Sequence, residues 1–515
     1  MAPRITLFLL LLLSLNSVSI AQDNVGDEST IMYPASYFAE WSPVTAQDML
    51  DRIPGLSGGS SFGSSGGFSR GGWGGFSGGR GGGSRGFGGG GSRGFGGGNR
   101  GSEILINGKR TAGKNNSTGG QLSRITTDQV DYIEIIRGTS GELDVRGSGQ
   151  VINVVLFETF STSTIQYQIG ANQADDNTVT PSGDVSYSGQ LGGLNFQASA
   201  RSNDSYSMYI SKENSILGDF SPNDIIRDIR ITEGNYSTIN TNLDYEFNSN
   251  SSGRFNAQFM EGGGDTELNR RTIDLKVMPN VSSFQREETP SSIENWEVGG
   301  DYEYNTERGD RFKVLFISNL FTRDSTRERF DLSDDGSENK NLFLDSGSTT
   351  RERIVRSSYT FDIFGGAQDI EFGAERAQTI LDSNLSLGVD IPGVTGSANF
   401  GGLVPVNVSN ANSSVEEMRY EPFVIHNWII SPRMSLESSL LYEDSEITQS
   451  GDVSKKRDFN YLKPKLDFRY DLTPAIQLRG TIEKIVQQLT FSDFVAATDN
   501  RDEDSNVQAG NENLK

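Results

Sequence analysis

The side chains that could carry chemistry in this chain are few, and their spacing excludes most kinds of active site. There is no cysteine and a single histidine, His426, so thiolate metal sites, disulfides and multi-histidine centres are excluded. Asp331 to Gly336 mimics the start of a calcium loop, but position twelve is Leu342, where a bidentate carboxylate is required. No nucleophile stands beside a base, and no phosphate-binding glycine motif lies between a strand and a helix. We therefore expect no enzyme, no metal site and no cofactor.

Ion pairing is the remaining chemistry, and it centres on the stretch from Arg100 to Leu156. Its charged candidates are Arg100, Glu134, Arg137 and Arg146. The apolar runs between them are short and are separated by glycine or by the Asn107-Gly108 pair, which is typical of a tight hairpin turn. This order predicts three short strands in a small compact unit.

Two elements upstream are expected to support this unit. Ile31 to Phe38 predicts an extended segment, and Pro43 to Ile53 predicts a short helix. Thr45-Ala-Gln-Asp48 is similar to a capping box, because the Thr45 hydroxyl can accept from the amide three residues on. Met49, Leu50 and Ile53 then share one face before Pro54-Gly55 ends the helix.

Composition and the first residues place the chain outside the cytoplasm. The formal net charge is −23 over 515 residues, which argues against nucleic acid as a partner. Residues 1–21 have the positive start, apolar run and small-residue cleavage site of a signal peptide, and the run is too short for a membrane helix. An exported chain of low hydropathy can still be a membrane protein if it forms a closed barrel.

Residues 57–101 differ in composition from the rest of the chain. Glycine fills about half of the positions, there is no acidic residue, and one octapeptide occurs at 83–90 and again at 91–98. Such a tract buries too little apolar surface to fold, so we expect a flexible insertion. Its candidate ligand-facing residues are Arg70, Trp73, Phe76, Arg80, Arg85, Phe87, Arg93 and Phe95. A spacer without a binding role is an equal alternative, and export argues against RNA binding by this arginine-glycine tract.

From Phe157 onward, apolar and polar residues alternate as in strands with one apolar face. Ile239 to Phe247 is one such run, and its length approaches the 9–11 residues or so that a tilted membrane strand needs. Short turns such as Gly192-Gly193 and Ser431-Pro432 alternate with polar segments such as Arg327–Thr350 and Asn384–Glu417, which we expect to be outer loops. A soluble β-sandwich shows the same alternation and stays an alternative.

Ile133-Glu-Ile-Ile-Arg-Gly138, Gly147–Leu156 and the helix ending in Ile-Pro-Gly together resemble the plug domain of TonB-dependent outer-membrane receptors. The resemblance implies a mainly β fold: an antiparallel transmembrane β-barrel of the 22-stranded type, occluded by a small α/β plug. The implied domains are a signal peptide at 1–21, a plug at 22–156 with the insertion at 57–101, and a barrel at 157–515. Gly510 to Lys515 resembles a stretch that precedes the last strands of these receptors, so we expect an incomplete barrel.

The same resemblance assigns roles to particular residues. Arginines matching Arg100 and Arg137 hold the plug against carboxylates of the barrel wall in this family, and Glu134 and Arg146 are expected in the same network. An alternative is that some of the four are solvated surface charges. The segment that couples to the energy-transducing partner is expected near the mature N-terminus, and its candidate residues are Glu28, Ser29, Thr30, Ile31, Met32 and Tyr33. The alternative is that these residues are only the first strand of the plug.

The function implied by the resemblance is active uptake across the bacterial outer membrane. The implied partners are the TonB-ExbB-ExbD complex, outer-membrane lipid and an extracellular ligand of the iron-chelate, cobalamin or glycan class. Two alternatives stay open: a passive channel or surface-binding protein with a plug-like domain, and an exported glycine-rich interaction protein with a soluble β half.

Overall fold

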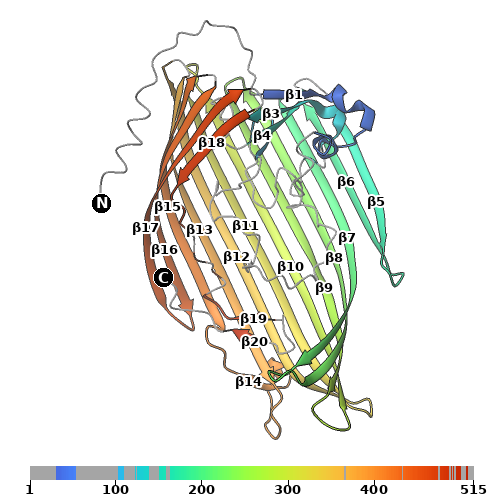
Figure 1. Ribbon diagram of the computed structural model, residues 1–515. Coiled ribbons are helices and arrows are strands. Elements are labelled where there is room, and N and C mark those ends of the chain that lie inside the picture. Colours follow the sequence, from blue (N-terminus) through green and yellow to red (C-terminus); the bar gives the residue numbers. More distant parts are fainter. Residues whose placement is uncertain are drawn as a thin grey trace.

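The computed structural model describes residues 30–53, 103–109, 122, 125–137, 150–157, 163–364, 367–431, 433–473, 476–486, 489, 491, 494–499 and 506–508. These residues form a small four-stranded unit and a large curved wall (Figure 1). None of the helices in the described ranges has the length and hydropathy of a membrane span.

The small unit is a mixed sheet with short helices. Its elements are β1 (Thr30–Pro34), η1 (Ala35–Trp41), α2 (Ala46–Leu50), β2 (Glu103–Ile106), η2 (Thr127–Gln129), β3 (Val130–Arg137) and β4 (Gln150–Leu156). The strand order is β1-β3-β4-β2, in which β2 runs parallel to β4 and the other pairs are antiparallel. The three strands expected between residues 103 and 156 are confirmed.

Local sequence explains the ends of these elements. Thr45 Oγ1 accepts from the Asp48 amide, and Asp48 Oδ2 accepts from the Thr45 amide at 3.0 Å, so the capping box is confirmed and α2 begins there. Asn107 and Gly108 both have positive φ, the geometry of a two-residue hairpin turn. The expected extended segment is wrong over its second half, because the chain turns into η1 at Ala35, directly after Pro34.

A dry core holds the small unit together. Phe38, Ile53, Val130 and Ile133 have no exposed surface, and Met49 is 1% exposed. Side chains from η1, α2, β3 and β4 meet in this single cluster. Burying such side chains contributes about 1.5–3 kcal/mol each, so the unit has its own hydrophobic core.

The wall is a 14-stranded antiparallel sheet in which successive strands pair, except that β13 pairs with β15 and the short β14 pairs only with β13. Its strands are β5 (Ser163–Gln173), β6 (Val179–Leu191), β7 (Leu194–Ile216), β8 (Pro222–Asn248), β9 (Ser251–Asp274), β10 (Val281–Asn305), β11 (Arg311–Leu332), β12 (Glu338–Ile363), β13 (Gln368–Val389), β14 (Val404–Val406), β15 (Asn412–Ser431), β16 (Met434–Gly451), β17 (Lys455–Thr473) and β18 (Ile476–Glu483). Within the described residues, β5 and β18 are its two edges. The helix η3 (Ala398–Phe400) precedes β14, and β19 (Ala497–Asp499) pairs with β20 (Asn506–Gln508).

The two faces of the wall differ as the alternation predicts. On β10, Glu297 and Asp301 are buried on the inner face, whereas Tyr302 and Tyr304 are each 42% exposed on the outer face. The outward residues of β11 are apolar or small from Phe312 to Leu320. Nine residues at about 3.3 Å each, tilted by about 40°, give an apolar band roughly 23 Å high, close to that of membrane barrels.

The strands continue far beyond this band. The expectation that Arg327–Thr350 and Asn384–Glu417 are outer loops is therefore wrong over most of the first segment and at both ends of the second. Arg327–Leu332 and Glu338–Thr350 belong to β11 and β12, and only residues 333–337 turn. Asn384–Val389 likewise extends β13, and Asn412–Glu417 begins β15. These stretches mix charged residues with buried apolar ones such as Leu344 and Leu385, and backbone pairing with their neighbours continues.

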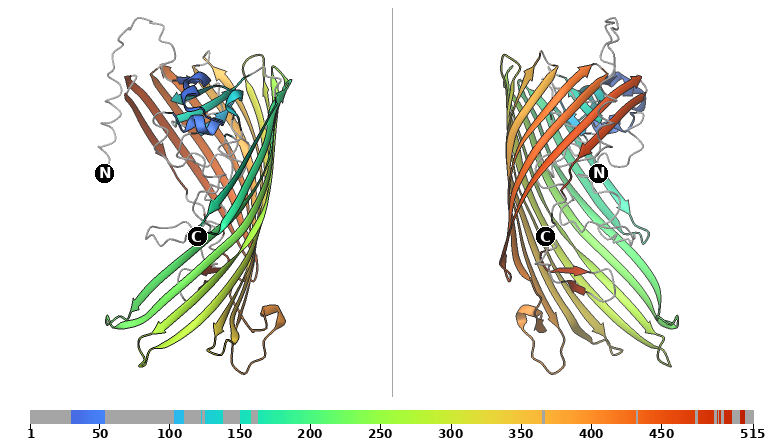
Figure 2. Two further views of the ribbon diagram at one scale, coloured as in Figure 1. Left: turned by 90° about the vertical axis from the view of Figure 1, so that its right-hand side faces the viewer. Right: turned by 60° about the vertical axis from the view of Figure 1, so that its left-hand side comes forward.

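The small unit lies on the concave side of the wall, near one end of its strands (Figure 2). We call this end the turn end, because the Gly192-Gly193 turn between β6 and β7 lies there, and the opposite end the β14 end (Figure 1).

Candidate functional site: the seam between the small unit and the wall

The small unit meets the inner face of β5, β6 and β9 at a contact region that we call the seam. Hydrogen bonds between described residues of the two parts cross it. Lys109 Nζ donates to Ser252 Oγ at 2.8 Å, and Gln129 Nε2 donates to Ser188 Oγ at 2.9 Å. Thr164 Oγ1 donates to Asp128 Oδ2 at 3.4 Å, a long and weak bond.

A cavity of about 130 Å³ lies within the seam. Ile106 and Leu156 from the small unit line it, together with Asn242, Asp244 and other residues of the wall. Its lining combines polar and apolar side chains, and its volume has room for several water molecules. The seam is therefore loosely packed and partly polar, unlike the core of the small unit.

The turn at Asn107-Gly108 positions Lys109 for its contact with the wall. Asn107 Oδ1 accepts from the Leu156 amide at 2.8 Å, and Asn153 Oδ1 accepts from the Gly108 amide at 2.7 Å. Both side chains fasten the turn to β4. Lys109, the next residue, is thereby held at the edge of the small unit that faces β9.

Away from the seam, the inner wall carries buried ion pairs. Glu375 on β13 accepts from Arg419 Nη2 at 3.0 Å and lies 3.6 Å from Arg356 Nη1. The Arg356 guanidinium also lies 4.0 Å from the centre of the Phe423 ring, a cation–π contact. Gly373 leaves room for that ring, because a Cβ there would clash with it.

A second inner group is centred on Lys463 of β17. Its Nζ donates to Glu421 Oε2 at 2.6 Å and to Glu443 Oε2 at 2.8 Å. Glu297, Glu352 and Glu417 are further buried carboxylates of the inner face. A charge buried in this way is stable only with a partner of opposite sign.

The structure places only some of the predicted site residues. Glu134 Oε1 accepts from Asn153 Nδ2 at 2.6 Å, so its described partner is within the small unit. Thr30, Ile31, Met32 and Tyr33 belong to β1, which pairs with β3. The backbone of Arg137 ends β3, whereas its side chain lies outside the described residues. Arg100, Arg146, Glu28, Ser29, Arg70, Trp73, Phe76, Arg80, Arg85, Phe87, Arg93 and Phe95 also lie outside them.

Sequence reasoning missed Lys109, Asp128 and Gln129 as seam residues. Each follows or precedes a predicted strand, and the polar type is ordinary for such a position. Only the Asn-Gly turn before Lys109 was a usable signal, because it fixes where that side chain starts.

The loop that mimics a calcium site is a tight turn. The Ser337 hydroxyl donates to Asp335 Oδ1 at 2.6 Å and the Ser337 amide at 2.9 Å, and together they hold the pKa of the Asp335 carboxyl below its ordinary value. A search of the described residues finds no group of carboxylates or imidazoles arranged for a metal ion. His426 faces outward, where its ring lies 6.5 Å from that of Trp428.

Several proteins of solved structure are similar to this chain at low sequence identity. The chain is similar to a chain of the FpvAI–pyocin S2 complex, with 13% identity over 74% of this chain and 50% of that one and a TM-score of 0.39. It is similar to the copper transporter OprC, with 11% identity over 72% and 53% and a TM-score of 0.37. The siderophore receptor PirA from Pseudomonas aeruginosa gives 11% identity over 91% and 97%, with a TM-score of 0.19.

The chain spans about half the length of the first two of these structures. No curated protein sequence matches it. The family model for the β-barrel of TonB-dependent receptor-like proteins matches residues 230–515, which is more than half of the chain. The chain therefore belongs to the TonB-dependent receptor-like β-barrel family.

Proposed function

We propose that this protein is an outer-membrane receptor that actively takes up a large or scarce nutrient. Residues 22–156 act as the plug, residues 157–515 form the wall, and the turn end faces the periplasm. The observation that carries the proposal is the seam: a unit with its own dry core is fixed to the wall by three described hydrogen bonds around a cavity. Such a unit can be displaced without unfolding.

Energy would come from the inner membrane through the TonB-ExbB-ExbD complex. β1 is an edge strand of the plug sheet and, in the described part of the chain, pairs only with β3. Met32 on this strand is 57% exposed. An edge strand of this kind can accept a strand from a partner, and this supports Glu28–Tyr33 as the coupling segment.

The charge lock stays part of the proposal. Arg100, Arg137 and Arg146 would pair with carboxylates of the inner wall. The glycine-rich insertion would act as a capture loop for the ligand. Unchanged ligand affinity after deletion of residues 58–98 would remove that role.

A cross-link across the seam tests the displacement of the plug. The chain has no cysteine, so Asp128→Cys with Thr164→Cys introduces a unique pair, bridged by a disulfide or by a short bis-maleimide. We expect uptake to stop when the pair is linked and to return after reduction of the disulfide.

The matched control links two strands of the wall and leaves the plug free. Gln166→Cys with Ser186→Cys joins β5 to β6 at a directly opposed pair and leaves the seam hydrogen bonds intact. Linking this pair should leave uptake unchanged. Transport that continues through the seam-linked protein, or that is insensitive to a proton uncoupler, favours the passive channel and contradicts the proposal.

A further inference from the structure

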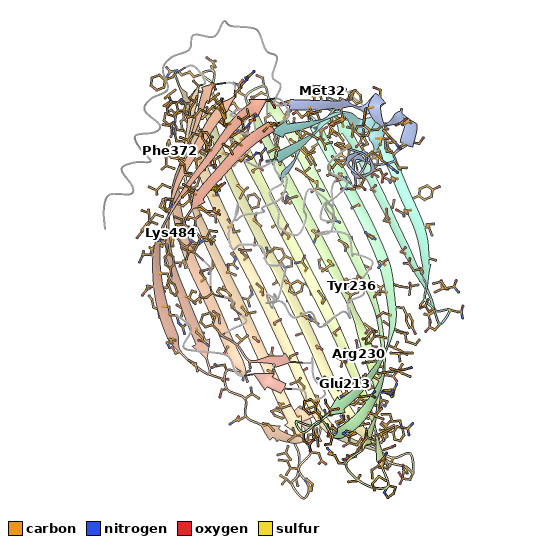
Figure 3. All side chains as sticks on the ribbon, in the orientation of Figure 1. Met32, Glu213, Arg230, Tyr236, Phe372 and Lys484 are labelled. Carbon is orange, nitrogen blue, oxygen red and sulfur yellow. The ribbon has the colours of Figure 1, made fainter. Side chains whose placement is uncertain are left out.

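Nine residues on each of four neighbouring wall strands form a block on the β14 side of the apolar band. It comprises 228–236 of β8, 262–270 of β9, 285–293 of β10 and 323–331 of β11, which lie in one continuous register. We call it the mouth block. Figure 3 labels Tyr236 and Arg230 on β8, with Arg230 nearer the β14 end.

The two faces of the mouth block carry opposite charge. Its inner face has five arginines and three carboxylates: Arg230, Arg270, Arg323, Arg327 and Arg329 against Asp228, Glu287 and Asp331. Its outer face has one arginine and six carboxylates: Arg286 against Glu233, Asp265, Glu267, Glu288, Asp324 and Glu328. In a chain of net charge −23, this concentration of arginine on one face is unusual.

Two of the inner arginines are committed to the wall itself. Arg270 forms a two-pronged pair with Asp228, at 2.9 and 2.8 Å, and Arg327 Nη2 lies 2.5 Å from Glu287 Oε2. These pairs use two of the three carboxylates. The third, Asp331, accepts from Gln285 Nε2 at 2.9 Å.

The other arginines keep part of their surface exposed. Arg230 makes no ion pair with any described residue, and Arg329 donates from Nε to the neutral Asn341 Oδ1 at 2.8 Å. Arg323 lies on the row of Tyr236 and Gly262. The positive charge of the inner face therefore exceeds what the described carboxylates of the block balance.

Small side chains lie between these arginines. Gly234, Gly264, Ser291 and Ser325 form one row across the four strands, and the hydroxyls of Thr232 and Thr266 lie 3.2 Å apart on the next. Gly262, Gly263 and Gly264 leave no room for a Cβ, because the neighbouring backbone or the Tyr236 ring occupies that space. The Tyr236 ring lies against Gly234 and Gly262, whereas the row of Gly264, Ser291 and Ser325 carries only small side chains, and there a ligand can approach several donors at once.

We propose that the inner face of the mouth block binds the transported ligand and that this ligand is a small polyanion bearing several carboxylate or phenolate-type oxygens. The guanidinium group matches such oxygens with two parallel hydrogen bonds, which a neutral glycan does not offer. This inference rests on the proposed function, because it names the ligand class of that same receptor.

Equilibrium binding to the purified full-length protein in detergent tests the proposal. The probes are citrate, ferric citrate and pyrophosphate as anions, and cyanocobalamin and maltohexaose as ligands without comparable charge. Arg230→Gln with Arg329→Gln removes two inner charges, neither of which is in a described ion pair. Arg271→Gln with Arg286→Gln is the matched control, with the same charge change on the outer face of β9 and β10.

We expect the anionic probes to bind and the inner double variant to weaken them about tenfold or more. The outer double variant should change affinity less than about twofold. Raising ionic strength from about 0.01 to 1 M shortens the Debye length from about 30 to 3 Å and should weaken anion binding to the parent protein.

The proposal is overturned if no anion binds, if only cyanocobalamin or maltohexaose binds, or if both double variants weaken anions equally. Binding in detergent requires neither the inner membrane nor a proton gradient. Failure here would therefore leave active uptake standing with another ligand class, and failure of the seam cross-link would leave the anion site standing.

Discussion

The core of the small unit and the seam that joins it to the wall differ in the polarity of their side chains and in how tightly these pack. In the core, Phe38 and Ile133 are fully buried among apolar neighbours. Across the seam, Lys109 and Gln129 reach serines of the wall beside a cavity of about 130 Å³. The difference shows where this molecule can come apart. Separating the unit from the wall breaks hydrogen bonds that water can replace and exposes a lining of mixed polarity, whereas opening its core exposes fully buried apolar side chains.

The largest effect is expected from a cavity in the core. Phe38→Ala should lower the unfolding free energy of the small unit by about 3–5 kcal/mol, because it removes a fully buried ring. Chemical unfolding followed by proteolysis of the unit measures this. Met32→Ala, at a position 57% exposed, should cost less than about 0.5 kcal/mol. Equal losses in the two variants would contradict a distinct core.

A smaller effect is expected at the helix start. Thr45→Ala removes the capping box of α2 and should cost about 1 kcal/mol in the same assay. Thr45→Ser keeps the hydroxyl and should restore most of the stability. If serine fails to do so, the contribution of Thr45 comes from its packing and not from the cap.

At the seam, the expected effect falls on displacement and not on folding. Gln129→Ala removes the bond to Ser188 and should favour the displaced plug by about 1 kcal/mol. Conductance of the protein in a planar bilayer should rise, while the stability of the core stays unchanged. Ser186→Ala, at a neighbouring inner position of β6, is the control. A loss of core stability in Gln129→Ala would contradict the claim that the seam bond contributes to displacement and not to folding of the core.

The smallest effect is expected at Thr164. Its bond to Asp128 is 3.4 Å long and exposed, so Thr164→Val should change the same conductance by an amount equivalent to less than about 0.5 kcal/mol. A response as large as that of Gln129→Ala would mean that bond length is a poor guide to the strength of the seam.

Local structures that depend on a few neighbouring residues were predictable from the sequence. The capping box at Thr45 and the turn at Asn107-Gly108 depend on residues three or fewer positions apart. The two faces of the wall follow from alternation along each strand. The extensions of β11 and β12 were predicted as loops because they carry many charged residues, and outside lipid a strand can carry such residues on either face.

The seam was not predictable because its partners are remote in the chain. Lys109 and Ser252 are 143 positions apart, and Gln129 and Ser188 are 59 apart. Nothing in the type of either serine marks it as a partner. The role of Glu134 in a charge lock and the start of the coupling segment stay predictions, although Glu134 contacts Asn153 and Thr30 begins β1.

The three glycines at 262–264 have a mechanical consequence for the entrance of the barrel. Because backbone atoms of β8 and β10 occupy the places of the missing Cβ atoms at 263 and 264, the spacing of these strands is set by the main chain alone. A methyl group added at either position would act as a wedge that forces neighbouring strands apart. The spacing of these strands therefore depends on glycine at both positions, whereas the arginines around them can change without moving the strands.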